Sequence, residues 1–369
     1  MPMAALFHKF CGLAGFLILC NGPFSSLFAQ TSPTPLALGL RGHYGFIIPH
    51  TEAIRDVSFS HPRGLELEVA WHLIGEKSWK NFATYPRVGA VLGFVDFDNP
   101  SVLGQSFHLS AFFEPFVAVR QRFNFSFRMG AGLAYLNQVY DAKTNPRNQF
   151  YSTPLSFILT ANLMLNYRLS PALGLRLGGF YNHISNGGIQ QPNKGINFPT
   201  LSLGLEYVWH PYDFNQKPKV DWRSLFPERL RLKAAFFGTA KTLDENNPKR
   251  YALVGLTGYA SYVVGRLSAL TGGLEWVFDD GLRERLQRAQ DPAHPHRASL
   301  LIGHELLLGR FTFTQQWGMY IFRAYFGNPL FYQRYGLEFS PHRRFFVGVN
   351  LKAHADVAEF LDFRVGMIW

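Results

Sequence analysis

The chain has 369 residues with a formal net charge of +11; aromatic residues make up 16% of it, and glycine occurs 34 times. Its two cysteines, Cys11 and Cys20, both lie in an apolar N-terminal segment, so cysteine catalysis and cysteine-bound zinc are excluded for the rest of the chain. Mean hydropathy is only −0.03, and beyond that segment charged or glycine-rich positions interrupt every run that could form a transmembrane helix. These values favour a transmembrane β-barrel, whose strands are apolar on one face only, over a secreted β-sandwich.

Residues 1–29 have the layout of a secretory signal peptide. A short basic region precedes an apolar run over 11–20 that is too short to span a bilayer, and the small residue Ala29 ends the segment. We therefore expect residues 1–29 to be removed on export. A lipoprotein signal ending at Cys20 is less favoured, because Leu19 occupies a position that prefers a small residue.

Alternation of apolar and polar residues with a period of two continues through most of the chain. In the first half it predicts strands over 36–48, 64–74, 86–96, 103–120, 123–137, 155–169, 172–184 and 198–209. A similar number of strands is predicted between about 228 and 369. The predicted fold class is all-β, an antiparallel transmembrane barrel of the outer membrane with about 16 strands. A barrel of about 14 strands and two tandem barrels of about eight strands each are the alternatives.

The lengths of the connections indicate which strand ends lie outside the cell. Connections after even-numbered strands are often minimal, as at 170–171, whereas those after odd-numbered strands are longer, as at 185–197. Short periplasmic turns opposite long external loops are typical of bacterial outer-membrane barrels. The longest periplasmic connection, 210–227, divides the chain into a first half of residues 30–209 and a second half of residues 228–369.

The segment that ends at Trp369 is an amphipathic strand. Apolar residues occupy the odd positions from Leu361 onward, while Asp362 and Arg364 lie on the other face. A terminal aromatic residue on such a strand resembles the signal by which outer-membrane barrels are recognised for assembly. We therefore expect an integral outer-membrane protein that engages the barrel assembly machinery.

The strand predicted over 172–184 leads into the segment His183-Ile-Ser185-Asn186-Gly187. His183 and Ser185 share the apolar face of this strand, where an imidazole and a hydroxyl two residues apart can hydrogen-bond. The glycine that follows lets the backbone approach an ester closely. This arrangement predicts a serine–histidine pair near the outer leaflet of the membrane.

The same segment, residues 183–197, resembles the active-site segment of the outer-membrane lipid A 3-O-deacylases (acyloxyacyl hydrolase family). The resemblance rests on the His-x-Ser-Asn motif, the Pro-Asn-x-Gly that follows it and the strand on each side. It extends over the first half of the chain, up to about Trp209, and gives no counterpart for the second half. It implies an outer-membrane serine esterase that hydrolyses ester-linked acyl chains of lipid A or a similar acylated lipid, with lipopolysaccharide as its partner.

The resemblance also implies a role for each residue of the motif. Ser185 would be the nucleophile and His183 the general base, while Asn186 and Gly187 would support the oxyanion. The family carries an acid at the position that matches Asn197. An amide oxygen there could orient the imidazole, but it would stabilise an imidazolium less than a carboxylate does, so slower turnover is expected. An inactive lipid-binding barrel is therefore an alternative.

The positive net charge favours an anionic partner at the membrane, and the compartment excludes nucleic acid. Arg283, Arg285 and Arg288, together with Arg297, are predicted to lie in one long external loop, and we expect the first three to bind phosphate groups of lipopolysaccharide. The histidines lack the spacing of metal ligands, so neither a metal nor a cofactor is expected.

A porin-like channel is the second class of function that the sequence leaves open, because a barrel of this size could enclose water. Inward, even-numbered positions such as Asn124, Ser126 and Arg128 are polar, as a water-filled channel requires. A channel would place its functional groups on these inward positions, whereas His183 and Ser185 are predicted to point outward.

Overall fold

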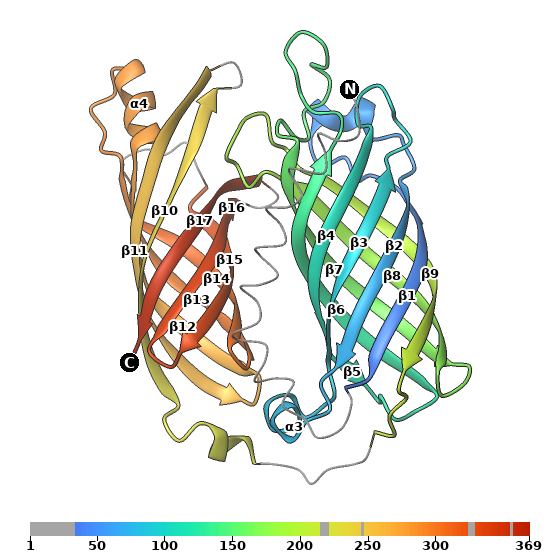
Figure 1. The fold of residues 1–369 in the computed structure, drawn as a ribbon. Coiled ribbons are helices and arrows are strands. Elements are labelled where there is room, and N and C mark those ends of the chain that lie inside the picture. Colours follow the sequence, from blue (N-terminus) through green and yellow to red (C-terminus); the bar gives the residue numbers. More distant parts are fainter. Residues whose placement is uncertain (1–33, 215–220, 245–246, 324–328, 355–356) are drawn as a thin grey trace, which may run out of the picture.

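The computed structural model forms two β-barrels connected in series (Figure 1). The structure describes residues 34–214, 221–244, 247–323, 329–354 and 357–369. The expected signal peptide, residues 1–29, lies outside the described residues. Among the described residues, no helix is long and apolar enough to cross a bilayer.

The first barrel is built from β1 to β9, in the order β4-β3-β2-β1-β9-β8-β7-β6-β5, and closes through an additional β4–β6 pairing. The strand β5 is only two residues long, and it pairs with β6, as β4 does. Because β4 and β5 together occupy one position in the ring, the barrel is effectively eight-stranded. The strands are β1 (Leu36–Gly45), β2 (Arg63–His72), β3 (Arg87–Asp96), β4 (Gln105–Glu114), β5 (Phe116–Val117), β6 (Phe123–Leu136), β7 (Leu155–Arg168), β8 (Leu173–Ser185) and β9 (Ile196–Trp209).

The second barrel closes in chain order from β10 to β17. Its strands are β10 (Leu230–Asp244), β11 (Asn247–Gly265), β12 (Ser268–Asp279), β13 (His296–Leu308), β14 (Phe311–Arg323), β15 (Phe331–His342), β16 (Phe345–His354) and β17 (Val357–Ile368). The described helices are short and lie in the connections: η1 (Glu52–Val57), α3 (Glu76–Phe82), η2 (Trp222–Leu225) and α4 (Asp280–Arg288).

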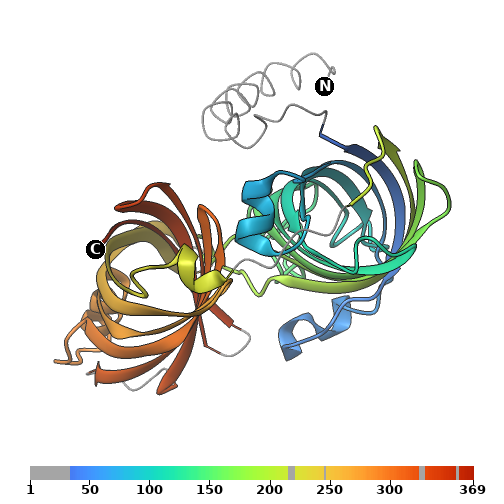
Figure 2. The same ribbon diagram turned by 90° about the horizontal axis from the view of Figure 1, so that it is seen from below.

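The all-β antiparallel barrel fold predicted from the alternation is confirmed, and the tandem arrangement is the one observed. A single large barrel does not form, because β1 pairs with β9 and β10 pairs with β17, so that each half closes on itself. The view along the barrel axes shows the two rings side by side (Figure 2).

Each strand of the first barrel has one outward apolar face and one inward polar face. On β9, Leu201 and Leu203 are 63% and 57% exposed, whereas Ser202 between them is 2% exposed. In a barrel that spans a bilayer, the exposed leucines contact acyl chains and the buried positions face the lumen. The prediction that the odd-numbered leucines of β8 and β9 point outward is therefore confirmed.

Spin labels can test this facing directly. A label at Leu201→Cys or Leu203→Cys should be accessible to lipid-soluble oxygen and shielded from an aqueous quencher, whereas the matched label at Ser202→Cys should be protected from both. The measurement is the power saturation of the label in protein reconstituted into bilayers. Quenching by the aqueous reagent at both leucine positions would contradict the barrel facing.

Ion pairs fill the lumens of both barrels. In the first, Arg128 lies 2.8 Å from Glu68 and 2.7 Å from Glu114, and Arg176 also pairs with Glu114. In the second, Arg334 pairs with Glu275 at 2.7 Å. Such buried charges are tolerated because each is matched by an opposite charge.

A cavity between His43, Glu66 and His108 in the first lumen has a volume of about 10 Å³, room for one water molecule at most. A second cavity, lined by Arg87, Arg176 and Glu206, has a volume of about 90 Å³. The polar inward residues that suggested a channel, Ser126 and Arg128 among them, instead bond to buried partners such as Glu114. The filled lumens of the described strands thus give no support to the porin-like alternative.

Candidate active site

The register between β8 and β9 brings the site residues together. His183 is paired directly with Asn197, and Ser185 follows His183 by two positions on the same strand. Side chains of directly paired residues project to the same face of a sheet, as do those at i and i+2. The three side chains therefore meet at the upper, loop-bearing end of the strands, on the outward face of the barrel.

A chain of hydrogen bonds connects these side chains. Ser185 Oγ lies 2.9 Å from His183 Nε2, and His183 Nδ1 lies 2.7 Å from Asn197 Oδ1. Asn197 Nδ2 lies 3.3 Å from Nδ1 of His50, whose Nε2 lies 2.9 Å from the Lys194 carbonyl oxygen.

The Lys194 carbonyl at the end of this chain, 2.9 Å from His50 Nε2, favours one arrangement of the protons over the alternative set by the Ile48 carbonyl, which lies 3.4 Å from His50 Nδ1. A backbone carbonyl oxygen only accepts, so the shorter contact to Lys194 places a hydrogen on His50 Nε2. In the neutral imidazole, Nδ1 then accepts from the Asn197 amide rather than donating to Ile48. The amide oxygen of Asn197 then accepts from His183 Nδ1–H, which leaves His183 Nε2 unprotonated and ready to accept from the Ser185 hydroxyl. The network thus selects the tautomer that a general base requires.

His50 is a site residue that the sequence analysis missed. It lies in the external connection between β1 and β2, outside any periodic segment, and reaches the site only because β1 pairs with β9. A lone histidine in a long loop carries no pattern that would connect it with Asn197.

Gly195 covers the imidazole. Its φ is +73°, a conformation that favours glycine, and a Cβ at this position would lie 2.6 Å from Cε1 of His183. Any larger residue would therefore displace the His183 imidazole or the loop above it.

The side chain of Asn186 organises the loop that follows Ser185. Its Nδ2 lies 2.7 Å from the Gln190 carbonyl oxygen and 3.2 Å from Ser152 Oγ, and its Oδ1 accepts from Gly188 N–H at 3.0 Å. Its backbone N–H donates to Asn193 Oδ1 at 2.9 Å.

The donors that were expected to face an oxyanion at Asn186 are thus engaged within the loop. The backbone N–H of Gly187 has no hydrogen-bond partner among the described residues. Of the two positions expected at the oxyanion, Gly187 is therefore the one with a free donor.

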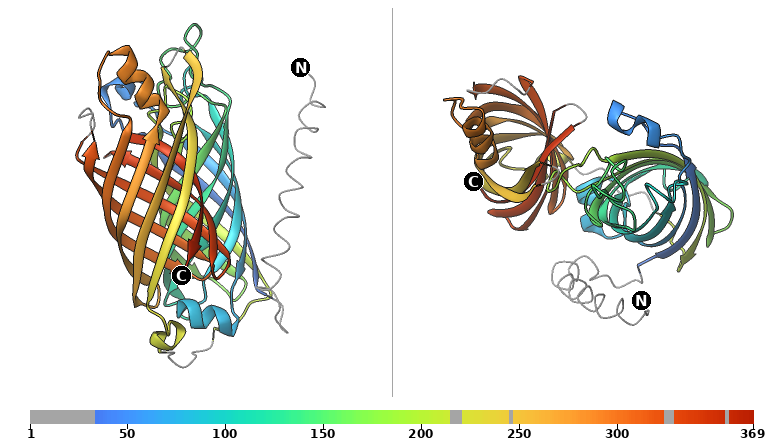
Figure 3. Two further views of the ribbon diagram at one scale, coloured as in Figure 1. Left: turned by 90° about the vertical axis from the view of Figure 1, so that its left-hand side faces the viewer. Right: turned by 90° about the horizontal axis from the view of Figure 1, so that it is seen from above.

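The predicted phosphate-binding arginines lie away from these residues. Arg283, Arg285 and Arg288 belong to α4, which projects from the side of the second barrel that faces away from the first (Figures 1 and 3). Arg283 pairs with Asp280, and Arg288 pairs with Glu284 at 2.9 Å. The structure does not bring this cluster to His183 and Ser185.

Arg297 does not lie in the external loop as predicted. It is part of β13, is 4% exposed, and pairs with Asp279 at 3.0 Å and with Glu359 at 2.6 Å. The strand begins earlier than the alternation suggested, because the helix α4 takes up much of the predicted loop.

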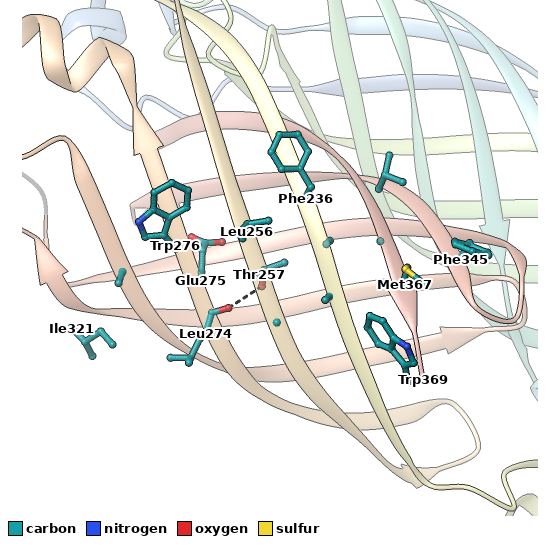
Figure 4. A pocket seen from close by; sticks show the side chains of 16 residues that line it. Phe236, Leu256, Thr257, Leu274, Glu275, Trp276, Ile321, Phe345, Met367 and Trp369 are labelled. Carbon is teal, nitrogen blue, oxygen red and sulfur yellow. Dashed lines mark hydrogen bonds between the residues drawn. The ribbon is translucent and has the colours of Figure 1, made fainter.

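A large apolar depression on the second barrel includes none of the candidate residues. It is a shallow, open surface on the outward side of β10, β11, β12 and β17, bordered by Phe236, Leu256, Trp276, Met367 and Trp369 (Figure 4). Side chains of this kind on the outside of a transmembrane barrel are contacts for acyl chains. The hydrogen-bonded network of the first barrel is therefore the candidate site.

A second serine–histidine pair is less complete. Ser268 Oγ lies 2.7 Å from His304 Nε2 on the second barrel, but no described residue hydrogen-bonds to His304 Nδ1. This pair therefore lacks the group that would fix the histidine tautomer. Among the described residues, no group of three or more histidine, cysteine, aspartate or glutamate side chains is arranged to hold a metal ion.

Two closed antiparallel barrels with leucine-covered outer faces and filled lumens define an integral outer-membrane β-barrel protein. Residues 63–206 match the family described as lipid A 3-O-deacylase (PagL), and residues 230–368 match the family described as acyloxyacyl hydrolase, C-terminal domain. The chain therefore belongs to the lipid A 3-O-deacylase family. Its second half, for which the sequence alone gave no counterpart, thus also matches a family model, that of the acyloxyacyl hydrolase C-terminal domain.

Solved structures with a similar fold include the outer-membrane enzyme PagL, at 19% identity and a TM-score of 0.33, covering 45% of this chain and 97% of that chain. Neisserial surface protein A (NspA) is similar at 9% identity and a TM-score of 0.32, covering 47% of this chain and 96% of that chain. The translocator domain of the autotransporter NalP from Neisseria meningitidis is similar at 10% identity and a TM-score of 0.23, covering 99% and 98%. Comparison with curated proteins gave no match.

Proposed function

We propose that this protein is an outer-membrane serine esterase that hydrolyses an ester-linked acyl chain of lipid A or a similar acylated lipid. The observation that carries the proposal is the hydrogen-bonded network Ser185–His183–Asn197 on the lipid-facing side of a family domain. Lipopolysaccharide in the outer leaflet presents its acyl esters to this face of the barrel.

In the first step, Ser185 Oγ attacks the carbonyl carbon of the ester while His183 Nε2 accepts the hydroxyl proton. The 2.9 Å separation of these two atoms is a hydrogen-bond distance suitable for this transfer. The negative charge that develops on the carbonyl oxygen needs a donor close to Ser185, and the unpartnered N–H of Gly187 supplies one.

In the second step, the tetrahedral intermediate collapses, and His183 gives its proton to the departing alkoxide oxygen of the lipid. An acyl ester of Ser185 forms, and a water molecule that His183 deprotonates then hydrolyses it. The products are a free fatty acid and a lipid with one more hydroxyl group, and the serine is restored.

Asn197 and His50 act as positioning residues in this scheme. The Asn197 amide oxygen holds the Nδ1–H of the base, and His50 keeps the amide from rotating by 180° and presenting its nitrogen instead. A neutral acceptor stabilises the imidazolium of the transition state less than a carboxylate would, because hydrogen bonds to a charged partner are roughly twice as strong as neutral ones. We expect an active enzyme with modest turnover.

The lipid-facing position of the site lets an acyl chain remain in the bilayer during hydrolysis. Tyr181 and Leu159, beside His183 on β8 and β7, are 46% and 45% exposed on the outer face. Two positions further down β8 from Tyr181, a Cβ on Gly179 would have no neighbour within 4 Å, so the surface is open there. A chain entering from the bilayer therefore meets apolar surface up to the ester-cleaving residues.

Mass spectrometry of lipid A tests the proposed function. Cells that express the protein should contain lipid A species lighter by one acyl chain, and cells that express the Ser185→Ala variant at the same level should not. An unchanged lipid A profile, together with no fatty acid release from other purified acylated lipids, would reject the esterase and leave the inactive lipid-binding alternative.

A further inference from the structure

The seam between β10 and β17 is open at the upper end of the second barrel. The two strands pair from Leu232 opposite Trp369 up to Gly238 opposite Phe363, and the described residues above Gly238 and Phe363 are not paired with each other. Pairing of β10 with its other neighbour continues to Asp244, and β17 pairs with its other neighbour back to Val357. The segments 239–244 and 357–362 are therefore held on one side only.

The loop that follows Ser185 in the first barrel occupies this opening. The backbone N–H of Leu361 donates to the Gly187 carbonyl at 2.8 Å, and the backbone N–H of Thr242 donates to the Ile189 carbonyl at 3.1 Å. The N–H of Gln191 donates to Thr242 Oγ1 at 3.1 Å. The loop thus bonds to β17 on one side and to β10 on the other. In Figure 1 the upper end of β17 reaches toward the loops of the first barrel.

Two glycines allow this close approach. Gly187 and Gly188 have φ values of +68° and +79°. A Cβ on Gly187 would lie 2.9 Å from Leu361 Cβ, and a Cβ on Gly188 would lie 3.0 Å from the Glu359 carbonyl oxygen. The conformation of the loop and its contact with the second barrel therefore depend on the same residues.

A separate contact joins the barrels at their opposite end. Arg266, in the turn between β11 and β12, donates to the Lys80 carbonyl oxygen at 2.7 Å and to the Trp79 carbonyl oxygen at 3.2 Å in α3. The view from below shows α3 between the two rings (Figure 2). Contacts at both ends restrict rotation of one barrel against the other, so the seam stays at a fixed position relative to the loop.

We propose that the second barrel is a positioning element for the ester hydrolysis, with Thr242 as its key side chain; this inference rests on the proposed function. The seam holds the backbone after Gly187, and Asn193 holds the backbone before it through Asn186 N–H. The Gly187 N–H lies between two fixed peptide groups and is pre-organised for an oxyanion. Without the seam, two consecutive glycines would sample many conformations.

The substitution Thr242→Val tests the inference, because it removes the hydroxyl that accepts from Gln191 N–H and keeps the shape of the side chain. We expect kcat to fall about tenfold, the effect of one lost hydrogen bond expressed in the transition state, with KM changed less than about twofold. Thr242→Ser should restore kcat. Thr239→Val, on the same strand at a position without a bond to the loop, is the matched control and should behave as wild type.

Hydrogen exchange of the unmodified protein gives a second test that needs no variant. The amides of Leu361 and Thr242, which donate to the loop, should be protected in the wild-type protein in detergent micelles. Wild-type kcat in a folded Thr242→Val, or rapid exchange at both amides, would overturn the positioning role. Neither result would affect the proposed function, which fails instead if Ser185→Ala retains activity.

Discussion

Replacing Ser185 with alanine should lower the rate of acyl ester hydrolysis by about 10³-fold or more, and His183→Ala should lower it by a similar factor. The two residues act as a unit, because Ser185 Oγ attacks only as His183 Nε2 removes its proton. Both side chains lie at the upper rim of the barrel, outside the lumen network that holds the strands together, so the variants should still fold. The assay is fatty acid release from purified lipid A, with heat-modifiable migration as the test of folding.

Ser268→Ala is the matched control, since it removes a serine that also hydrogen-bonds to a histidine, but on the second barrel. This variant should retain the wild-type rate. Folded Ser185→Ala protein with near wild-type release, or an inactive Ser268→Ala variant, would move the reaction away from the proposed site.

Asn197→Leu should lower kcat by about 10- to 100-fold, because it removes the acceptor for His183 Nδ1–H and frees the imidazole to adopt the other tautomer. Asn197→Asp should keep kcat or raise it several-fold, since a carboxylate of the same shape would stabilise the imidazolium by a charge-assisted hydrogen bond. Steady-state kinetics on one purified lipid A preparation measure both variants.

The substitution His50→Ala tests whether the orientation of the Asn197 amide matters for the rate, because it leaves Asn197 itself in place. It should reduce kcat less than Asn197→Leu does, because the amide keeps its oxygen and loses only the partner that fixes its direction. If Asn197→Leu instead has the wild-type kcat, then Asn197 does not orient the base and another group must.

Much of the first barrel was predictable because alternation with period two reports directly which face of a strand is buried. The alternation placed His183 and Ser185 on one face, and the register adds that Asn197 is paired directly with His183 and so shares this face. The strand ends were predicted less well: the strand expected over 103–120 is divided into β4 and β5, and the strand expected over 36–48 ends at Gly45.

The division into two barrels could not be derived in the same way. One large barrel and two small ones have the same alternating strands and the same turns, and they differ only in whether β9 pairs with β1 or with β10. The sheet edges that meet are far apart in sequence, so no local pattern records the choice.

The buried ion pairs inside the first barrel could have been predicted from the sequence, but the inward charged residues were not interpreted as pairs. Glu114, Arg128 and Arg176 all have the even, inward parity of their strands, and opposite charges on facing positions favour buried ion pairs in a narrow barrel. The same polar inward positions are also compatible with a water-filled channel, which is why that alternative was open from the sequence alone.

His50 and the seam residue Thr242 share a different difficulty. His50 lies in a loop without periodicity, and Thr242 lies in a barrel strand whose contact with the site depends on how two barrels dock. Their roles follow from hydrogen bonds between residues far apart in the sequence. Thr242 and Gln191 are 51 residues apart, and His50 and Asn197 are 147 residues apart.

Covalent labelling by a fluorophosphonate tests the central claim, that Ser185 is the activated nucleophile, most directly. The purified full-length protein is treated with the reagent in micelles and digested, and the modified peptide is identified by mass spectrometry. We predict a phosphonyl adduct on Ser185 that forms together with loss of esterase activity and is absent in His183→Ala. An adduct on Ser268 or another serine, or full activity in protein modified at Ser185, would contradict the assignment.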